Sequence, residues 1–159
     1  MKTNHHTIPF TWKHIDTLVK HLVRSVKNTS VEYDVIVGVL RGGMVPAVIL
    51  SHSLNIRTII PISSIRTLDD SVNASKHEPY IYADQKEIQR LKGKRILLVD
   101  DILGSGQTLS EVRHLLQKHH PQLITSVVLV TNLDNLTNSS NKADMCGKEV
   151  RGWVIFPWE

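Results

Sequence analysis

The sequence has little cysteine, few aromatic residues and no long apolar run, and each scarcity excludes a class of protein. Cys146 is the single cysteine in 159 residues, so no internal disulfide can form and a reducing compartment is expected. No apolar stretch approaches the roughly 20 residues that a membrane helix requires. The first residues, from Met1 to His6, lack the apolar core of a signal peptide. We therefore expect a cytoplasmic protein with no membrane partner.

The basic residues are not clustered as in a nucleic-acid-binding protein, and the histidines are not spaced as in a zinc site. The net charge is only +4, from 19 basic and 15 acidic residues, and the basic residues are scattered with few aromatics among them. We therefore expect no nucleic-acid partner, although a small polyphosphate substrate would suit this charge. The pairs His5-His6 and His119-His120 have no cysteine or carboxylate partners at zinc-site spacing.

The apolar pattern predicts a single domain over residues 1–159 in which strands alternate with helices. This alternation favours an α/β fold with a mainly parallel, twisted sheet flanked by helices. Pro61 suggests that its strand is at an edge or is irregular. The polar stretch 63–85 has no periodicity, which indicates a long loop that is either functional or disordered. The predicted helices span 11–27, 45–54 and 106–119, and the predicted strands 34–40, 58–62, 95–99 and 126–130, with apolar character returning over 150–156.

Two adjacent carboxylates, Asp100 and Asp101, follow the strand that ends at Val99, and a short polar loop leads from them into a helix. In a parallel α/β sheet, ligands bind beyond the carboxyl ends of the strands, and a helix N-terminus attracts anions. One carboxylate could hold ribose hydroxyls and the other a Mg²⁺ ion. The loop that could bind phosphate consists of Ile102, Leu103, Gly104, Ser105, Gly106, Gln107 and Thr108.

The run from Ile96 to Thr108 resembles the signature for 5-phosphoribosyl diphosphate (PRPP) of type I phosphoribosyltransferases. It is neither a Walker A loop nor a dinucleotide G-x-G-x-x-G motif. Further stretches resemble the xanthine-guanine group of that family. These are Val37–Pro46, Ile62–Ser64 and the ending Gly152–Glu159, whereas the long loop and the region 134–148 are unmatched.

The resemblance implies transfer of 5-phosphoribosyl from PRPP to a nucleobase, with Mg²⁺ as cofactor and diphosphate as the second product. Leu40, Arg41 and Gly42 would bind the diphosphate, and the peptide joining Leu40 to Arg41 is often cis in this family. Asp100, Asp101 and Arg41 would be catalytic, residues 100–108 would bind PRPP, and Asp101 would hold the metal. The 63–85 segment would be a flexible hood, with Arg66 and Lys76 as candidate phosphate contacts. A homodimer or homotetramer is also implied.

The base pocket implied by the resemblance departs from the pattern at two positions. Trp153 would stack on the base and the backbone of Val154 would read its edge, whereas Trp158 is expected to be a core or subunit-interface residue. Gly104 stands where the 6-oxopurine enzymes usually carry an Asp, and Asn132 stands where they carry a Lys. The resemblance implies xanthine, guanine or hypoxanthine as the base. The two departures leave open two alternatives, which are another base, such as adenine, and a regulatory protein that binds PRPP or a nucleotide with little or no catalysis.

Overall fold

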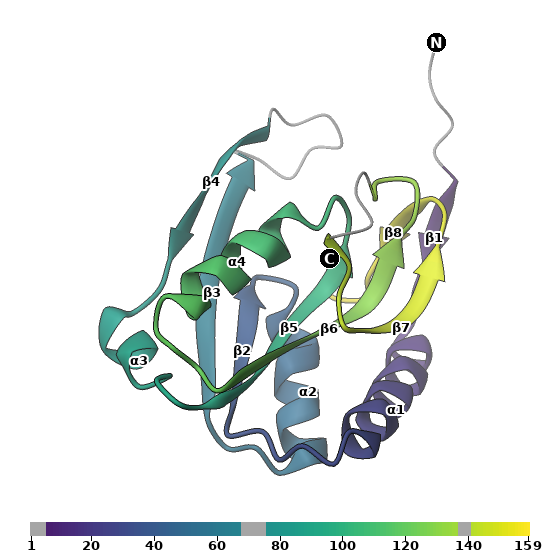
Figure 1. Ribbon diagram of the computed structural model, residues 1–159. Helices are drawn as coiled ribbons and strands as arrows, with labels where there is room; N and C mark the ends of the chain where they lie inside the picture. The colour runs from purple at the N-terminus through teal and green to yellow at the C-terminus, as the bar shows by residue number, and fades with distance from the viewer. Residues whose placement is uncertain (1–5, 68–75, 137–140) are drawn as a thin grey trace.

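The computed structural model describes residues 6–67, 76–136 and 141–159 (Figure 1). The predicted alternation of strands and helices is confirmed, and short elements are added at both ends of the chain. In order, the elements are β1 (Thr7–Pro9), α1 (Trp12–Asn28), β2 (Val35–Leu40), α2 (Met44–Leu54), β3 (Ile59–Thr67), β4 (Lys76–Tyr82), α3 (Gln85–Gln89), β5 (Arg95–Leu103), α4 (Gln107–Gln117), β6 (Leu123–Asn132), β7 (Met145–Val150) and β8 (Trp153–Ile155).

The main sheet has six strands in the order β4-β3-β2-β5-β6-β7. Every neighbouring pair is parallel except β3 with β4, which is antiparallel. The expected mainly parallel sheet is therefore confirmed. A second, two-stranded parallel sheet joins β1 to β8, so the first and last strands lie side by side (Figure 1).

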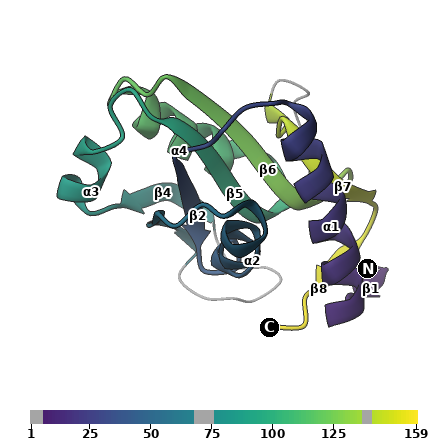
Figure 2. The same cartoon turned by 90° about the horizontal axis from the view of Figure 1, so that it is seen from below.

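Apolar layers cover both faces of the main sheet. Helices α1 and α2 pack on one face through residues such as Leu22 and Leu50, and α4 packs on the other through Val112 and Leu116 (Figure 2). Strand β2 is covered on both faces and is buried from Val35 to Val39, which explains its unbroken apolar run. Within the described ranges, no helix combines the length and apolar character needed to cross a membrane.

The order of the strands creates a switch point between β2 and β5. From β2 the chain passes through α2 to β3 on one side, and from β5 it passes through α4 to β6 on the other side. The loops that leave the carboxyl ends of β2 and β5 therefore diverge and open a crevice between them, which is where ligands bind in such sheets. These two loops are the two that the sequence analysis selected.

The described parts of the segment 63–85 are not the irregular loop that the polar sequence predicted, and residues 68–75 lie outside the described residues. Strand β3 continues through Ser63 to Thr67, and β4 pairs with it from Lys76 to Tyr82. The short helix α3 follows, with the Asp84 carboxylate accepting hydrogen bonds from the first-turn N–H groups. The prediction failed because a hairpin is held by backbone hydrogen bonds, which need no apolar alternation.

Two further features of the sheet were predicted in part or not at all. Strand β3 is an interior strand, but β4 ends at Tyr82, opposite Ser63. Pro61 therefore lies where one side of β3 is unpaired. That local edge accommodates its missing N–H. Strand β7 was not predicted, because as the last strand of the sheet it exposes Lys148 and Glu149 and has no apolar pattern.

Candidate functional site

The two predicted phosphate-binding segments touch each other at the switch point. A Cβ atom added to Gly42 would lie 1.7 Å from Oδ2 of Asp101, and one added to Gly43 would lie 2.8 Å from Oδ1 of Asp100. Gly42 therefore cannot carry a side chain unless the Asp101 carboxylate moves, and at Gly43 the backbone of Val39 and Asp100 also blocks one. The loop after β2 and the acidic pair at the end of β5 form one site, although about 60 residues separate them in sequence.

The strands separate where this contact begins. Strands β2 and β5 pair from Val35 with Ile96 to Gly38 with Val99, and no further. Beyond that point the loop turns back toward β5, with Gly43 against the carbonyl oxygen of Val39 and the backbone of Asp100. The Leu40–Arg41 peptide is cis, as the resemblance implied.

The acidic pair lies at the end of β5, which continues through both residues to Leu103. Oδ1 of Asp100 accepts a hydrogen bond of 2.9 Å from the N–H of Asp101, and Oδ1 of Asp101 accepts one of 2.8 Å from the N–H of Ile102. Burial raises the pKa of Asp100 well above its usual range, and the charge of Asp101 raises it further. Burial also raises the pKa of Asp101, against the lowering effect of its hydrogen bonds. Such a pair favours a bound cation.

Trp158 is the neighbour of this pair that the sequence analysis missed. It was assigned to the core or to a subunit interface, and it does stack on Phe156 with ring centroids 4.6 Å apart. Its indole N–H is also buried without a hydrogen-bond partner among the described residues. The same group lowers the pKa of Asp101, so it lies near that carboxyl, outside hydrogen-bonding geometry. No local pattern near residue 158 indicates a place beside residue 101.

The N-cap residue of α4 is Gly106, which offers no side-chain acceptor, and the first turn contains no acidic residue. The hydroxyl of Ser105 accepts a hydrogen bond from the N–H of Gln107 over 3.4 Å. The helix dipole and the remaining first-turn N–H groups favour an anion at this end. The two glycines of the loop differ. Gly106 has φ of +76° and a Cβ there would lie 2.3 Å from the carbonyl oxygen of Asn141. At Gly104 the nearest atom, the Cβ of Asn135, would be 3.7 Å away, so an added Cβ fits.

Strand β8 contains the predicted base-binding residues Trp153 and Val154. One of its two backbone edges pairs with β1 and the other faces away from it. The N–H of Trp153 donates to the carbonyl oxygen of His6 over 2.8 Å, and the carbonyl of Ile155 accepts from the N–H of Phe10 over 2.8 Å. In a parallel ladder, the residue between these two directs its N–H and C=O to the opposite side. That residue is Val154, which is paired in register with Ile8. Trp153 has an exposed fraction of 41%.

Asn132 is arranged differently from a residue that binds a base directly. Its side chain is only 4% exposed. The Nδ2 amide donates to the carbonyl of Gly152 over 2.8 Å, and Oδ1 accepts from the N–H of Asp134 over 3.0 Å. Both ends of the amide are thus occupied within the protein. The contact with the base that the alignment implied is not favoured, because buried amide groups that are already paired are costly to release.

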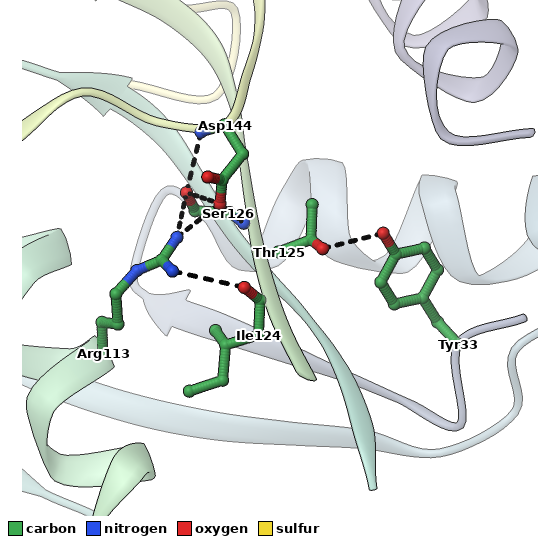
Figure 3. Close-up of polar contacts among 6 residues, drawn as sticks. All are labelled: Tyr33, Arg113, Ile124, Thr125, Ser126 and Asp144. Atoms are coloured by element: carbon green, nitrogen blue, oxygen red, sulfur yellow. Dashed lines mark hydrogen bonds and ion pairs between the residues drawn. The ribbon is translucent and has the colours of Figure 1, made fainter. Parts of the chain in front are cut away.

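The opposite end of the sheet has well-formed polar clusters of another kind (Figure 3). The Asp144 carboxylate accepts from the N–H of Ser126 over 2.6 Å, from its hydroxyl over 2.7 Å, and from the guanidinium of Arg113. Tyr33 donates to Thr125 over 2.8 Å. Two hollows lined by described residues also lie here. Neither hollow, of about 460 and 400 Å³, includes a residue of the predicted site.

Two further expectations can be placed only in part. Among the described residues, no group of three or more histidine, cysteine or acidic side chains could by itself hold a metal ion, so a cation at Asp101 would need ligands from substrate or water. Arg66 lies in β3 and Lys76 in β4, but the structure does not describe their side chains.

Comparisons with known proteins agree with this geometry. The model of the phosphoribosyl transferase domain family matches residues 6–159. A xanthine-guanine phosphoribosyltransferase from Cereibacter sphaeroides is 33% identical over 126 residues, or 78% of this chain and 68% of the relative. The chain therefore belongs to the phosphoribosyltransferase family, whose members are generally glycosyltransferases. Within that family it is similar to enzymes that act on purines.

Solved structures show the same likeness. The purine phosphoribosyltransferase of Pyrococcus horikoshii is 28% identical with a TM-score of 0.75, over 96% of this chain and 94% of that one. A protein of Neisseria gonorrhoeae, solved with bound ppGpp, has a TM-score of 0.83 over 98% of this chain and 90% of that one. At 23% identity, the second likeness shows the fold alone.

Proposed function

We propose that this chain transfers the 5-phosphoribosyl group of PRPP to a purine base, giving a nucleoside monophosphate and diphosphate. One observation supports this proposal above the others. Gly42 and Gly43 lie directly against the carboxylates of Asp101 and Asp100, so a site for diphosphate and a site for ribose form a single crevice. The N-terminus of α4 lies beside it and suits the 5′-phosphate.

The residues of the crevice have separate tasks in this proposal. Arg41 and the N–H groups of residues 41–43 hold the diphosphate as it leaves, Asp100 holds the ribose hydroxyls, and the 104–108 loop fixes the 5′-phosphate. Much of the rate then comes from positioning, because C1 of the ribose needs its leaving group and the attacking base in line. The partly buried carboxylates with raised pKa values fit Mg²⁺, with Asp101 as its protein ligand. When bound, Mg²⁺ neutralises charge on the diphosphate.

The base is proposed to stack on Trp153 and to be read by the N–H and C=O of Val154. Trp153 is partly exposed, and Val154 directs these two groups away from β1. A donor and an acceptor on one residue suit the edge of a purine that offers both. No side chain is proposed to contact the exocyclic group at position 6 of the purine. The residue aligned with that role, Asn132, is uncharged and its amide is hydrogen-bonded within the protein.

A second function has its own supporting observations. Gly104 cannot accept or donate a proton near N7 of a bound purine, and the amide of Asn132 is bonded within the protein. A general base typically contributes roughly 10²–10⁴-fold to a rate. A chain without one could bind PRPP or a purine nucleotide as a regulator, or could act on another base such as adenine.

An assay of diphosphate release tests the two functions against each other. The purified chain is incubated with PRPP, Mg²⁺ and, in turn, xanthine, guanine, hypoxanthine and adenine, and PRPP binding is measured by calorimetry. We expect release with at least one purine and none without Mg²⁺. Binding of PRPP without turnover on any base would overturn the transferase and support the regulatory function.

A further inference from the structure

The peptide unit that joins Gly152 to Trp153 is held at both of its ends. Its carbonyl oxygen accepts the hydrogen bond from Nδ2 of Asn132 over 2.8 Å. Its N–H donates to the carbonyl of His6 over 2.8 Å. A peptide unit is planar, so two bonds on opposite sides fix its rotation. The direction in which the Trp153 side chain leaves the backbone follows from that rotation and from the pairing of β8 with β1.

Gly152 allows this arrangement and cannot be replaced within it. Its φ of +125° lies in a region that residues with a side chain rarely adopt, and a Cβ there would be 2.4 Å from the carbonyl oxygen of His6. The turn before β8 is therefore pressed against the N-terminal segment on one side and tied to β6 on the other. Asn132 is itself immobile, since its Oδ1 accepts from the N–H of Asp134 and its side chain is 4% exposed.

We infer that Asn132 is a positioning residue for the base, which orients Trp153 and Val154 through the Gly152–Trp153 peptide. This inference rests on the proposed function, because it takes Trp153 and Val154 as the base-binding residues. It replaces the direct contact to the base that alignment implied for position 132. Discrimination at position 6 of the purine then depends on the backbone of β8 rather than on a charged side chain.

Ser126 provides a matched control on the same strand. It lies toward the amino end of β6, whereas Asn132 is the last residue of the strand. It is 0% exposed and, like Asn132, it joins β6 to a later segment through hydrogen bonds, here to Asp144. Ser126→Ala and Asn132→Ala both leave buried polar groups without partners, so both should lower the melting temperature. Only Asn132→Ala is close to the base-binding strand.

The test compares Michaelis constants for base and for PRPP in the two variants. We expect Asn132→Ala to raise KM for the base roughly tenfold and to leave KM for PRPP within about twofold. Asn132→Asp keeps the acceptor for Asp134 but places an oxygen against the carbonyl of Gly152, so its KM for the base should rise at least as much. Ser126→Ala should change neither constant. Equal changes in both variants, or an unchanged KM for the base in Asn132→Ala, would overturn the inference.

A measurement without ligand separates the inference from the proposed function. Hydrogen exchange of the backbone N–H of Trp153 should be faster in Asn132→Ala than in the wild type, and unchanged in Ser126→Ala. Failure of transfer in the wild type would contradict the proposed function alone. Unchanged exchange at Trp153 in Asn132→Ala would contradict the positioning role alone.

Discussion

The two ends of the six-stranded sheet hold carboxylates in opposite electrostatic states. At the amino ends, Asp34 accepts hydrogen bonds of 2.8 and 3.0 Å from the backbone and guanidinium of Arg95, and its pKa is lowered to about 2, chiefly by the guanidinium. Burial raises the pKa of Asp144, but bonds from Ser126 and Arg113 outweigh it and lower the pKa. At the carboxyl ends, burial raises the pKa of Asp100 and of Asp101.

This difference separates groups that stabilise the fold from groups kept for a ligand. A carboxylate with a lowered pKa has its compensating charge within the protein, so its ionised form favours the folded state. A carboxylate with a raised pKa lacks that compensation, so its ionised form disfavours folding until a cation or a donor arrives. The amino ends of the strands are thus complete by themselves, whereas the carboxyl ends become complete with a ligand.

The largest expected effect comes from neutralising the acidic pair. Asp101→Asn and Asp100→Asn should each lower transfer at least roughly a hundredfold, because the ribose and metal contacts are lost. Both variants should melt at or above the wild-type temperature at neutral pH, since an uncompensated charge is removed. Rates of diphosphate release and thermal melts check the two parts. A variant that lost activity and stability together would contradict the separation of roles.

The next effect is a gain at Gly104. Space around its Cβ position admits Gly104→Asp, which restores a carboxylate where the 6-oxopurine enzymes have one. We expect turnover with hypoxanthine or guanine to rise roughly tenfold or more. Gly106→Ala is the control in the same loop and should lower affinity for PRPP, because its φ is +76° and Asn141 blocks the added Cβ. If Gly104→Asp shows no gain in turnover while its affinity for PRPP is intact, the absence of a general base at position 104 does not limit the rate.

A smaller effect distinguishes glycines at the two ends of the sheet. Gly42→Ala forces a methyl group onto Asp101, so we expect KM for PRPP to rise several-fold and stability to fall by roughly 1–3 kcal/mol. Gly93 lies in the turn before β5, with φ of +71° and no atom within 4 Å of an added Cβ. Gly93→Ala should cost roughly 1 kcal/mol through backbone strain and leave the kinetics unchanged. Enzyme kinetics and denaturant melts measure both, and a kinetic defect in Gly93→Ala would contradict the contrast.

The smallest effect is a pH dependence of stability at Asp34. Its pKa falls from 3.8 to about 2 on folding, so its stabilisation is fully present above pH 3.8 and disappears as the pH falls toward 2. Asp34→Asn should therefore lower the melting temperature by a few degrees at neutral pH and by progressively less in acid. Asp100→Asn should show the opposite trend, gaining on the wild type as pH rises above 3.8, because the pKa of Asp100 is raised. Parallel melting curves for the two variants would refute the comparison.

Local sequence was enough to predict the elements that have strong signals of their own. Thr11 was expected to cap α1, and its hydroxyl does accept from the N–H of His14 over 3.4 Å. Continuous apolar runs identified the central strands because both faces of such strands are buried. The hairpin of β3 and β4 and the edge strand β7 lack that signal, since backbone pairing with a neighbour holds them and the sequence does not record the neighbour.

By itself, the sequence determined the class of site, because acidic pair, glycine loop and helix start are consecutive and their chemistry is local. The tertiary structure alone decided what surrounds that site. It brought Gly42 and Gly43 onto the carboxylates, placed the indole of Trp158 near Asp101, and bonded the amide of Asn132 to the carbonyl of Gly152. Each of these contacts joins segments far apart in the chain. Only the packing of the sheet and its crossovers determines which of them meet.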